Sequence, residues 1–192
     1  MKLGVLVSGR GSNLEAVLTA RPPGIEVVLV ISNRPGVRAL DVAAVHGVTA
    51  RVLRRADFGG DALARDAAMG RALTEAGVEL ALLAGYDQLL RPSYFASFRG
   101  RTINIHPSLL PAHGGAGMMG PAVHRSVLAA GETETGATVH EVIAELDAGP
   151  ILASARVPVL PGDDVETLAG RVLDEEHRLL VATLTEMDRQ SP

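Results

Sequence analysis

The chain has 192 residues, a formal charge of −4 and no cysteine. The lack of cysteine excludes disulfides, thiolate metal sites and a cysteine nucleophile, and a small acidic excess without long charge runs disfavours a nucleic-acid groove or an anionic membrane surface. The length suits a single domain, 1–192, with a substantial core. No apolar run is long enough for a signal peptide or a membrane span, so we expect a cytoplasmic protein.

The first half of the chain alternates apolar strands with helices. Strands are expected at 3–7, 26–31, 50–53, 79–83 and 102–106, and helices from the turn at 8–13 through residue 20 and at 37–46, 61–76 and 91–98. Strands that alternate with helices favour a parallel sheet with right-handed crossovers. The expected fold class is therefore α/β, with a Rossmann-like, mostly parallel sheet flanked by helices.

The second half changes character. Residues 136–146 and 151–159 are predicted to form an antiparallel hairpin closed by a tight turn at 147–150. Asp163 and Asp164 then precede a long helix with an apolar stripe. Residues 114–120 contain four glycines and are expected to be the most mobile stretch.

Two polar residues mark the end of the strand 102–106. Alternation along this strand sends Asn104 and His106 to the same face, and Pro107 ends the strand because it cannot donate to a ladder. A carboxamide N–H can stabilise an oxyanion, and an imidazole can give or take a proton near neutral pH. The alternative is an exposed face that holds Asn and His by chance.

The first glycine-containing turn, Ser8–Asn13, follows a strand and opens a helix. Free backbone N–H groups of Gly11, Ser12 and Asn13, together with the helix dipole, can hold a phosphate. The spacing matches neither the dinucleotide fingerprint nor the Gly-Lys-Ser/Thr phosphate loop. An ordinary turn with a Ser or Asn cap is the alternative.

Two acidic residues are further candidates. Asp147 is predicted at the hairpin tip, where acids are common, but a carboxylate beside His106 would favour the imidazolium form. Glu176 falls on the apolar stripe of the last helix, and an inward charge needs a partner, which can be a ligand. The remaining histidines lack the spacing of metal sites, so loop or packing roles are expected for His113, His124 and His140.

Together these segments resemble the phosphoribosylglycinamide formyltransferases, folate-dependent enzymes of purine synthesis. The segments that carry the resemblance are 8–13, 83–86, 104–111, 145–150 and 175–177. The central Asn-x-His-Pro-Ser-Leu-Leu-Pro block is typical of enzymes that use formyl folates, and the other segments narrow the resemblance to the glycinamide enzymes. Methionyl-tRNA formyltransferases carry an extra C-terminal domain and formyltetrahydrofolate hydrolases an N-terminal regulatory domain, and we expect neither here.

The resemblance implies the formyltransferase fold and transfer of a formyl group from 10-formyltetrahydrofolate, as co-substrate, to the amine of N1-(5-phosphoribosyl)glycinamide. It implies no metal, nucleic-acid or membrane partner, and a monomer or homodimer. The implied catalytic residues are Asn104, His106 and Asp147, the implied acceptor-binding residues Gly11, Ser12, Asn13 and Glu176, and the implied folate-binding residues Arg65, Asp87, Gln88, Leu89, Leu90 and Asn104.

This chain departs from the family pattern at two places. Asp87-Gln88-Leu89-Leu90 stands where Met-Arg-Ile-Leu is usual, so main-chain contacts survive but a side-chain role of the arginine is lost. The loop 112–123 is longer and richer in glycine than the commonest family form. Two alternatives remain open: formyl transfer to another sugar amine or to water, and a non-enzymatic sensor of phosphoribosyl ligands. A sensor would not need Asn104, His106 and Asp147 together.

Overall fold

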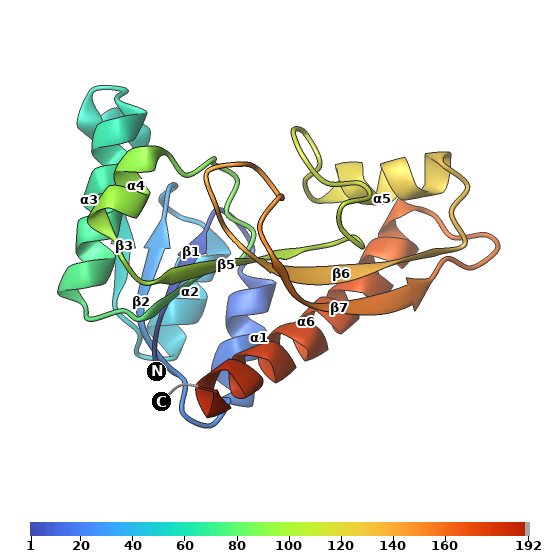
Figure 1. Ribbon diagram of the computed structural model, residues 1–192, viewed down its shortest axis with the longest axis horizontal. Coiled ribbons are helices and arrows are strands. Elements are labelled where there is room, and N and C mark those ends of the chain that lie inside the picture. The colour runs from blue at the N-terminus through green and yellow to red at the C-terminus, as the bar shows by residue number, and fades with distance from the viewer. Residues whose placement is uncertain (191–192) are drawn as a thin grey trace.

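The computed structural model describes residues 1–190, which form a seven-stranded sheet in the order β3-β2-β1-β4-β5-β6-β7 (Figure 1). The strands are β1 Lys2–Val7, β2 Glu26–Ser32, β3 Ala50–Val52, β4 Leu80–Leu83, β5 Arg101–His106, β6 Glu134–Glu141 and β7 Ile151–Pro158. The first five strands pair in parallel, whereas β6 pairs antiparallel with both β5 and β7. The expected mostly parallel α/β sheet with antiparallel C-terminal strands is confirmed.

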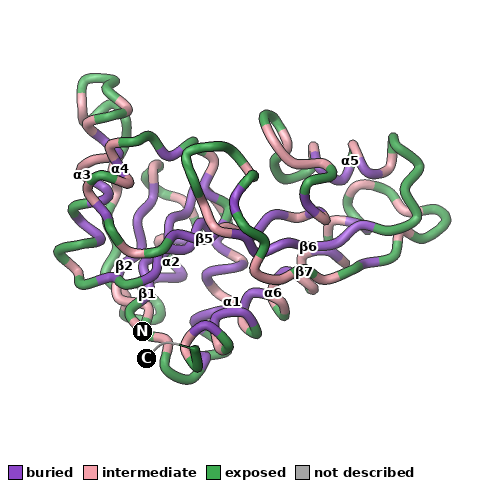
Figure 2. Tube along the Cα trace, viewed as in Figure 1, coloured by how far each residue is buried: buried purple, intermediate pink, exposed green. Residues whose placement is uncertain are grey.

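Helices cover both faces of this sheet. They are α1 Ser12–Ala20, α2 Arg38–Val45, α3 Ala62–Glu75, α4 Pro92–Ser97, α5 Pro121–Ala129 and α6 Val165–Arg189, with a short 3-10 helix at Arg55–Phe58. Successive strand residues point to opposite faces, so Val5 packs in a core with α1, α2 and α6, while Leu6 packs in a second core with α3 and α4. The central strands are consequently buried on both faces, as parallel strands usually are (Figure 2).

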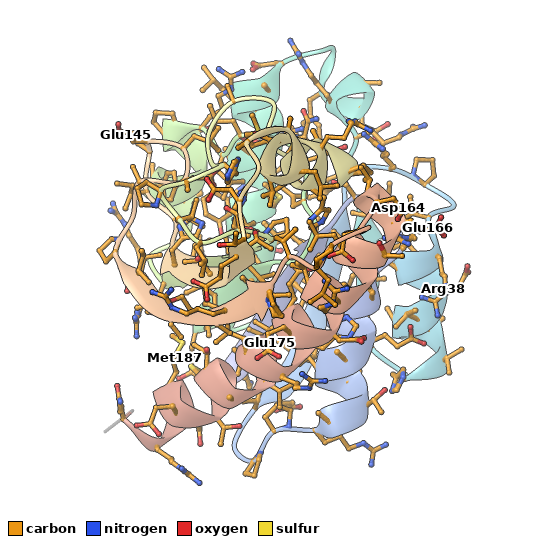
Figure 3. The ribbon with its side chains drawn as sticks, turned by 90° about the vertical axis from the view of Figure 1, so that its right-hand side faces the viewer. Arg38, Glu145, Asp164, Glu166, Glu175 and Met187 are labelled. Carbon is orange, nitrogen blue, oxygen red and sulfur yellow. The ribbon has the colours of Figure 1, made fainter. Side chains whose placement is uncertain are left out.

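The long last helix is confirmed, and its start has a clear local cause. The Asp164 carboxylate accepts from the Thr167 N–H at 2.8 Å, and the Thr167 hydroxyl accepts from the Asp164 N–H at 2.9 Å. This reciprocal pair satisfies N–H groups that a helix start leaves open. From Asp164 the helix runs past Glu175 to Met187 (Figure 3). It packs against α1, β6 and β7, which carries Glu176 to the start of α1.

The second half of the chain differs from the prediction in one connection and contains one helix that was not predicted. The strand β6 ends at Glu141, and residues 142–150 form an exposed loop instead of a strand with a tight turn. Asp147 in this loop takes a left-handed φ of 52° and accepts a hydrogen bond from the Gly115 N–H at 2.8 Å, so the loop bends toward a distant segment. Moreover, the glycine-rich stretch is followed at once by α5, which begins at Pro121 and was not predicted.

The carboxyl ends of β1, β2, β4 and β5 meet at one edge of the sheet. From β1 the chain crosses to β2 on one side, and β4 later pairs on the other side, so the strand order reverses beside β1. Open α/β sheets bind ligands at such a reversal, outside the carboxyl ends of the strands. Within residues 1–190 no helix has both the length and the apolar character needed to cross a membrane.

Candidate active site

A cavity of about 270 Å³ opens at this edge of the sheet. We call it the central cavity; its walls come from the strand ends and loops within 83–90, 104–107, 115–120 and 140–147. The walls are mainly apolar with a few convergent polar groups, which is the usual composition of a small-molecule site. Seven of the predicted site residues line it: Asp87, Gln88, Leu89, Leu90, Asn104, His106 and Asp147.

Asn104 is held by a histidine on the neighbouring strand. The β5–β6 register places Asn104 opposite His140, whose Nδ1–H donates to the Glu141 carbonyl at 2.9 Å. The His140 Nε2 is then left to accept from Asn104 Nδ2 at 3.0 Å. Burial lowers the pKa of His140, although Asp147 and the Glu141 carbonyl oppose the shift, so the neutral form that can accept is favoured. One N–H of the Asn104 amide is thus fixed, and the other is left to donate within the cavity.

His106 lies between two acceptors. Its Nε2 is 3.0 Å from the His113 carbonyl oxygen, and its Nδ1 is 3.9 Å from Asp147 Oδ2. A neutral imidazole carries only one N–H, so the imidazolium is the form that can donate on both sides. Asp147 also lies 3.6 Å from His140 Nε2. The structure therefore brings Asn104, His106 and Asp147 into one cavity wall, although Asp147 lies in a longer loop between β6 and β7 than the tight turn expected.

The start of α1 has the geometry of an anion site. Gly11 has a φ of 75°, and a Cβ there would lie 2.8 Å from the Ala39 Cα, so only glycine fits this turn. No side chain caps α1, which leaves the N–H groups of its first turn without a capping oxygen. Such N–H groups, with the positive end of the helix dipole, favour a phosphate.

Glu176 meets this turn from α6, so the inward orientation predicted from the apolar stripe is confirmed. The side chain accepts a long hydrogen bond of 3.5 Å from Asn13 Nδ2. Burial raises the pKa of Glu176 to about 7, although the Asn13 hydrogen bond and the charge of Arg10 oppose this. The Asn13 Oδ1 is buried without a hydrogen-bond partner. Buried polar groups that lack good partners mark a place where a ligand can complete the hydrogen bonds.

The raised pKa of Glu176 predicts a pH-dependent stability. The folded protein keeps a proton on Glu176 up to about pH 7, whereas the unfolded chain releases it near the ordinary value of 4.5. The folded state thus binds more protons between these values, and the free energy of unfolding should fall by about 3 kcal/mol as the pH rises through them. Urea unfolding at about pH 5 and about pH 8 measures this, and Glu176→Gln should remove that part of the slope.

Glu175→Gln is the matched control, because it makes the same substitution one residue earlier on α6. Glu175 pairs with Arg178 on the helix surface, so this variant should keep the pH slope of the wild type. Equal slopes in the wild type and in Glu176→Gln would contradict the prediction.

Asp87 joins three loops at the cavity. Its N–H donates to Ser8 Oγ at 2.9 Å, and its carboxylate accepts from Asn33 Nδ2 at 2.8 Å and pairs with Arg34. Burial raises the pKa of Asp87, but the hydrogen bonds from Asn33, Ser8 and Gln88 and the charge of Arg34 outweigh it and leave the pKa below its usual value. The acid that replaces the family's methionine is therefore ionised and tied to the loop after β2, a network that the sequence did not indicate.

Arg65 is not brought to the central cavity. It is 2% exposed, and its Nε donates to Asp66 at 2.8 Å, while the second Asp66 oxygen accepts from the Arg91 N–H at 2.8 Å. The guanidinium is thus engaged inside the protein and lies outside the cavity lining. Within residues 1–190, no three His, Asp or Glu side chains are grouped to hold a metal ion.

The sequence interpretation missed His140, for which a loop or packing role was expected. The structure shows it instead in the cavity wall, bonded to Asn104. One signal was available: Thr138 and His140 alternate along an antiparallel strand next to β5, so they share a face with the residues opposite them. That signal depends on the strand pairing and cannot be used without it.

Comparison with known proteins gives a consistent result. The formyl transferase family model matches residues 1–184. The chain is 43% identical to the trifunctional purine biosynthetic protein adenosine-3 of Gallus gallus over 96% of this chain, but it spans only 18% of that relative's length. It is 35% identical to the phosphoribosylglycinamide formyltransferase of Haemophilus influenzae, covering 93% of this chain and 82% of the relative.

Solved structures agree with this result. A glycinamide ribonucleotide transformylase of Symbiobacterium toebii superposes with a TM-score of 0.90 at 40% identity, covering 98% of this chain and 88% of the other. A phosphoribosylglycinamide formyltransferase of Brucella melitensis gives a TM-score of 0.88 at 40% identity, covering 100% of this chain and 97% of the other. With its fold, its cavity and its sequence in agreement, the chain belongs to the formyl transferase family.

Proposed function

We propose that the protein transfers the formyl group of 10-formyltetrahydrofolate to the amine of N1-(5-phosphoribosyl)glycinamide, a step in the synthesis of the purine nucleotide IMP. The observation that carries this proposal is the convergence of Asn104, His106 and Asp147 on one cavity. Relatives that bear the corresponding enzyme name support it. We take residues 1–192 as one domain, which the single seven-stranded sheet within the described residues 1–190 supports.

The central cavity suits the folate donor. Apolar side chains such as Leu90, Ile105 and Val142 line it, and a flat pterin ring can pack between such walls. The main chain of 87–90 and the amide of Asn104 supply hydrogen-bonding groups at its edge. Gln88 cannot supply the charge of the usual family arginine, and the proposal gives Arg65 no part because it pairs with Asp66.

The acceptor is assigned to the neighbouring turn. Its phosphate is expected at the N–H groups of Gly11, Ser12 and Asn13, where the helix dipole favours negative charge. Glu176 faces the same turn and can accept hydrogen bonds from N–H or O–H groups of the acceptor. The acceptor then extends along the carboxyl edge of the sheet toward Asn104.

The chemistry follows from the groups in the cavity. The neutral amine attacks the formyl carbon, a C–N bond forms, and the formyl oxygen becomes an oxyanion. The Asn104 N–H and the His106 imidazolium stabilise that oxyanion, while Asp147 favours the charged form of His106. A proton passes from the new ammonium to the departing folate nitrogen, through water held by Asp147, and the bond to that nitrogen breaks. The products are the formylated acceptor and tetrahydrofolate.

One assay tests the proposal directly. Purified protein is mixed with 10-formyltetrahydrofolate, with and without the glycinamide ribonucleotide, and the folate absorbance is followed. Turnover that requires the acceptor supports the transferase. Turnover without the acceptor would replace it with a hydrolase, and no turnover in either mixture would replace it with a ligand sensor.

Glu176→Gln is expected to weaken acceptor binding and leave folate binding unchanged. Gln keeps the shape of the side chain but turns one acceptor oxygen into an N–H2 donor, which no longer matches donors on the ligand. At about pH 8, where the Glu176 carboxylate is ionised, loss of one charged hydrogen bond typically costs about 1.5 to 3 kcal/mol, or roughly 10- to 150-fold in the dissociation constant. Calorimetry with each ligand measures both constants.

Glu175→Gln again serves as the control and should bind both ligands like the wild type. Weakened folate binding with unchanged acceptor binding in Glu176→Gln would contradict the assignment. An unfolded Glu176→Gln variant would show instead that the carboxylate has a structural role.

A further inference from the structure

A short main-chain segment contacts two of the proposed catalytic side chains at once. We call residues 113–115 the clamp segment. The His113 carbonyl lies 3.0 Å from His106 Nε2, and the Gly115 N–H donates to Asp147 Oδ2 at 2.8 Å. One contact holds the His106 ring at Nε2, and the other holds the Asp147 oxygen that faces His106 Nδ1, so the position of the clamp segment affects the orientation of both side chains.

The clamp segment is held in turn by the side chain of His113. The ring Nδ1 lies 2.8 Å from the hydroxyl of Ser126 on α5, and Nε2 lies 3.8 Å from Glu132. The His113 ring is 14% exposed, whereas the Glu132 side chain is 49% exposed, so the bond to Ser126 is the main anchor of the ring. α5 therefore serves as the support to which the clamp segment is attached.

The backbone of His113 requires such support. Its φ is 54°, in the left-handed region that a residue with a Cβ seldom adopts. A conformation of this kind persists only where surrounding contacts determine it. The contacts available here are the hydrogen bond to Ser126 and the approach of Nε2 to Glu132. Neither His113 nor Ser126 lines the central cavity, so any effect on the reaction has to pass through the main chain.

We propose that His113 is a positioning residue for formyl transfer: its ring, bonded to Ser126, fixes the carbonyl and the amide that orient His106 and Asp147. The proposal rests on the roles assigned above to His106 and Asp147. Because the His113 carbonyl oxygen can only accept, it requires a proton on His106 Nε2, and this hydrogen bond directs Nδ1 toward Asp147. If the clamp segment shifts, the His106 ring loses this fixed direction, and its positive charge is no longer held at a fixed place near the oxyanion.

Ser126→Ala is the variant that tests this most cleanly. It removes the partner of the His113 ring without changing the left-handed residue itself, and alanine is well tolerated in a helix. We expect kcat to fall by about tenfold, since misplacement of a reacting group by about 1 Å can cost roughly 100-fold, and KM for either substrate to change by less than about twofold. Nitrogen NMR of His106 in the free protein should show a displaced Nε2 signal.

A second variant and a control complete the test. His113→Asn keeps a residue that tolerates the left-handed region but shortens its reach to Ser126, and combining it with Ser126→Ala should add little to either single effect. Ser93→Ala is the control. It removes the hydroxyl of Ser93 on α4, which donates to the Leu63 carbonyl of α3 at 2.8 Å, and it should leave kcat and the His106 signal unchanged.

The outcomes separate this inference from the proposed function. A wild-type protein without transferase activity would overturn the proposed function. An unmoved His106 signal together with an unchanged kcat in Ser126→Ala would overturn the positioning role, whatever reaction the wild type catalyses. Additive losses in the double variant would equally overturn it, because they would mean that His113 and Ser126 act separately.

Discussion

Replacing Asn104 or His106 by alanine should lower turnover by about 100-fold or more, the usual cost of removing one oxyanion donor, while leaving the fold intact. Both side chains lie at the end of β5 and line the central cavity. Neither belongs to the apolar clusters that hold the sheet together, so each substitution should lower the reaction rate and not the stability of the fold. Steady-state turnover with both substrates measures the effect, and circular dichroism shows whether the variants are folded.

Two further variants sharpen this prediction. Asn104→Asp keeps the shape of the side chain but removes the N–H donor and adds a negative charge, so it should lower turnover at least as far as Asn104→Ala. His46→Ala, at an exposed position after α2, should leave turnover unchanged. A folded Asn104 or His106 variant with near wild-type turnover would show that the oxyanion is stabilised by other groups.

Local sequence pattern was sufficient to predict most strands and turns in the first half of the chain. The apolar strands and the turns that end them were predictable because each is encoded within a few neighbouring residues. The placement of Asn104 and His106 on one face followed from the two-residue period of a strand, and Pro107 marked where it ends. These features needed no knowledge of distant contacts.

The loop 142–150 was not predictable in this way. Its apolar residues continue the alternation of the preceding strand, which suggested a longer strand and a tight turn. In the structure, Gly149 lies so close to the Glu141 carbonyl that a Cβ would be 1.9 Å from its oxygen, and Asp147 bonds to Gly115. The second partner lies 32 residues earlier in the chain, so the course of the loop depends on a contact that no local pattern contains.

Contacts between distant residues also decide the roles of His140, His113 and Arg65, which the sequence therefore did not reveal. His140 and its partner Asn104 are 36 residues apart, and only the strand register brings them together. Spacing rules for metal sites could exclude one role for His113 but could not indicate its bond to Ser126. For Arg65, the sequence showed a cation on a helix and did not show that the helix turns it inward beside Asp66.

Asp147→Asn should lower turnover on the order of 100-fold or more, because Asn keeps the shape of the side chain and removes the charge that favours the His106 imidazolium. The substitution should not strain the backbone, since Asn tolerates the left-handed φ of 52° found at this position. The amide oxygen can still accept from the Gly115 N–H, so the loop is expected to stay in place. The change therefore tests the charge more than the geometry.

The same variant has a direct spectroscopic consequence. With the carboxylate 3.9 Å from Nδ1 removed, the His106 ring loses its charged neighbour, so the environment of Nδ1 should change. Nitrogen NMR of the His106 ring compares the Nδ1 signal in the two proteins. Asp41→Asn, which removes an exposed carboxylate from α2, is the control and should change neither quantity. If Asp147→Asn left both the His106 Nδ1 signal and the turnover unchanged, Asp147 would be an ordinary loop acid, and the proton transfer to the departing folate nitrogen would need another group.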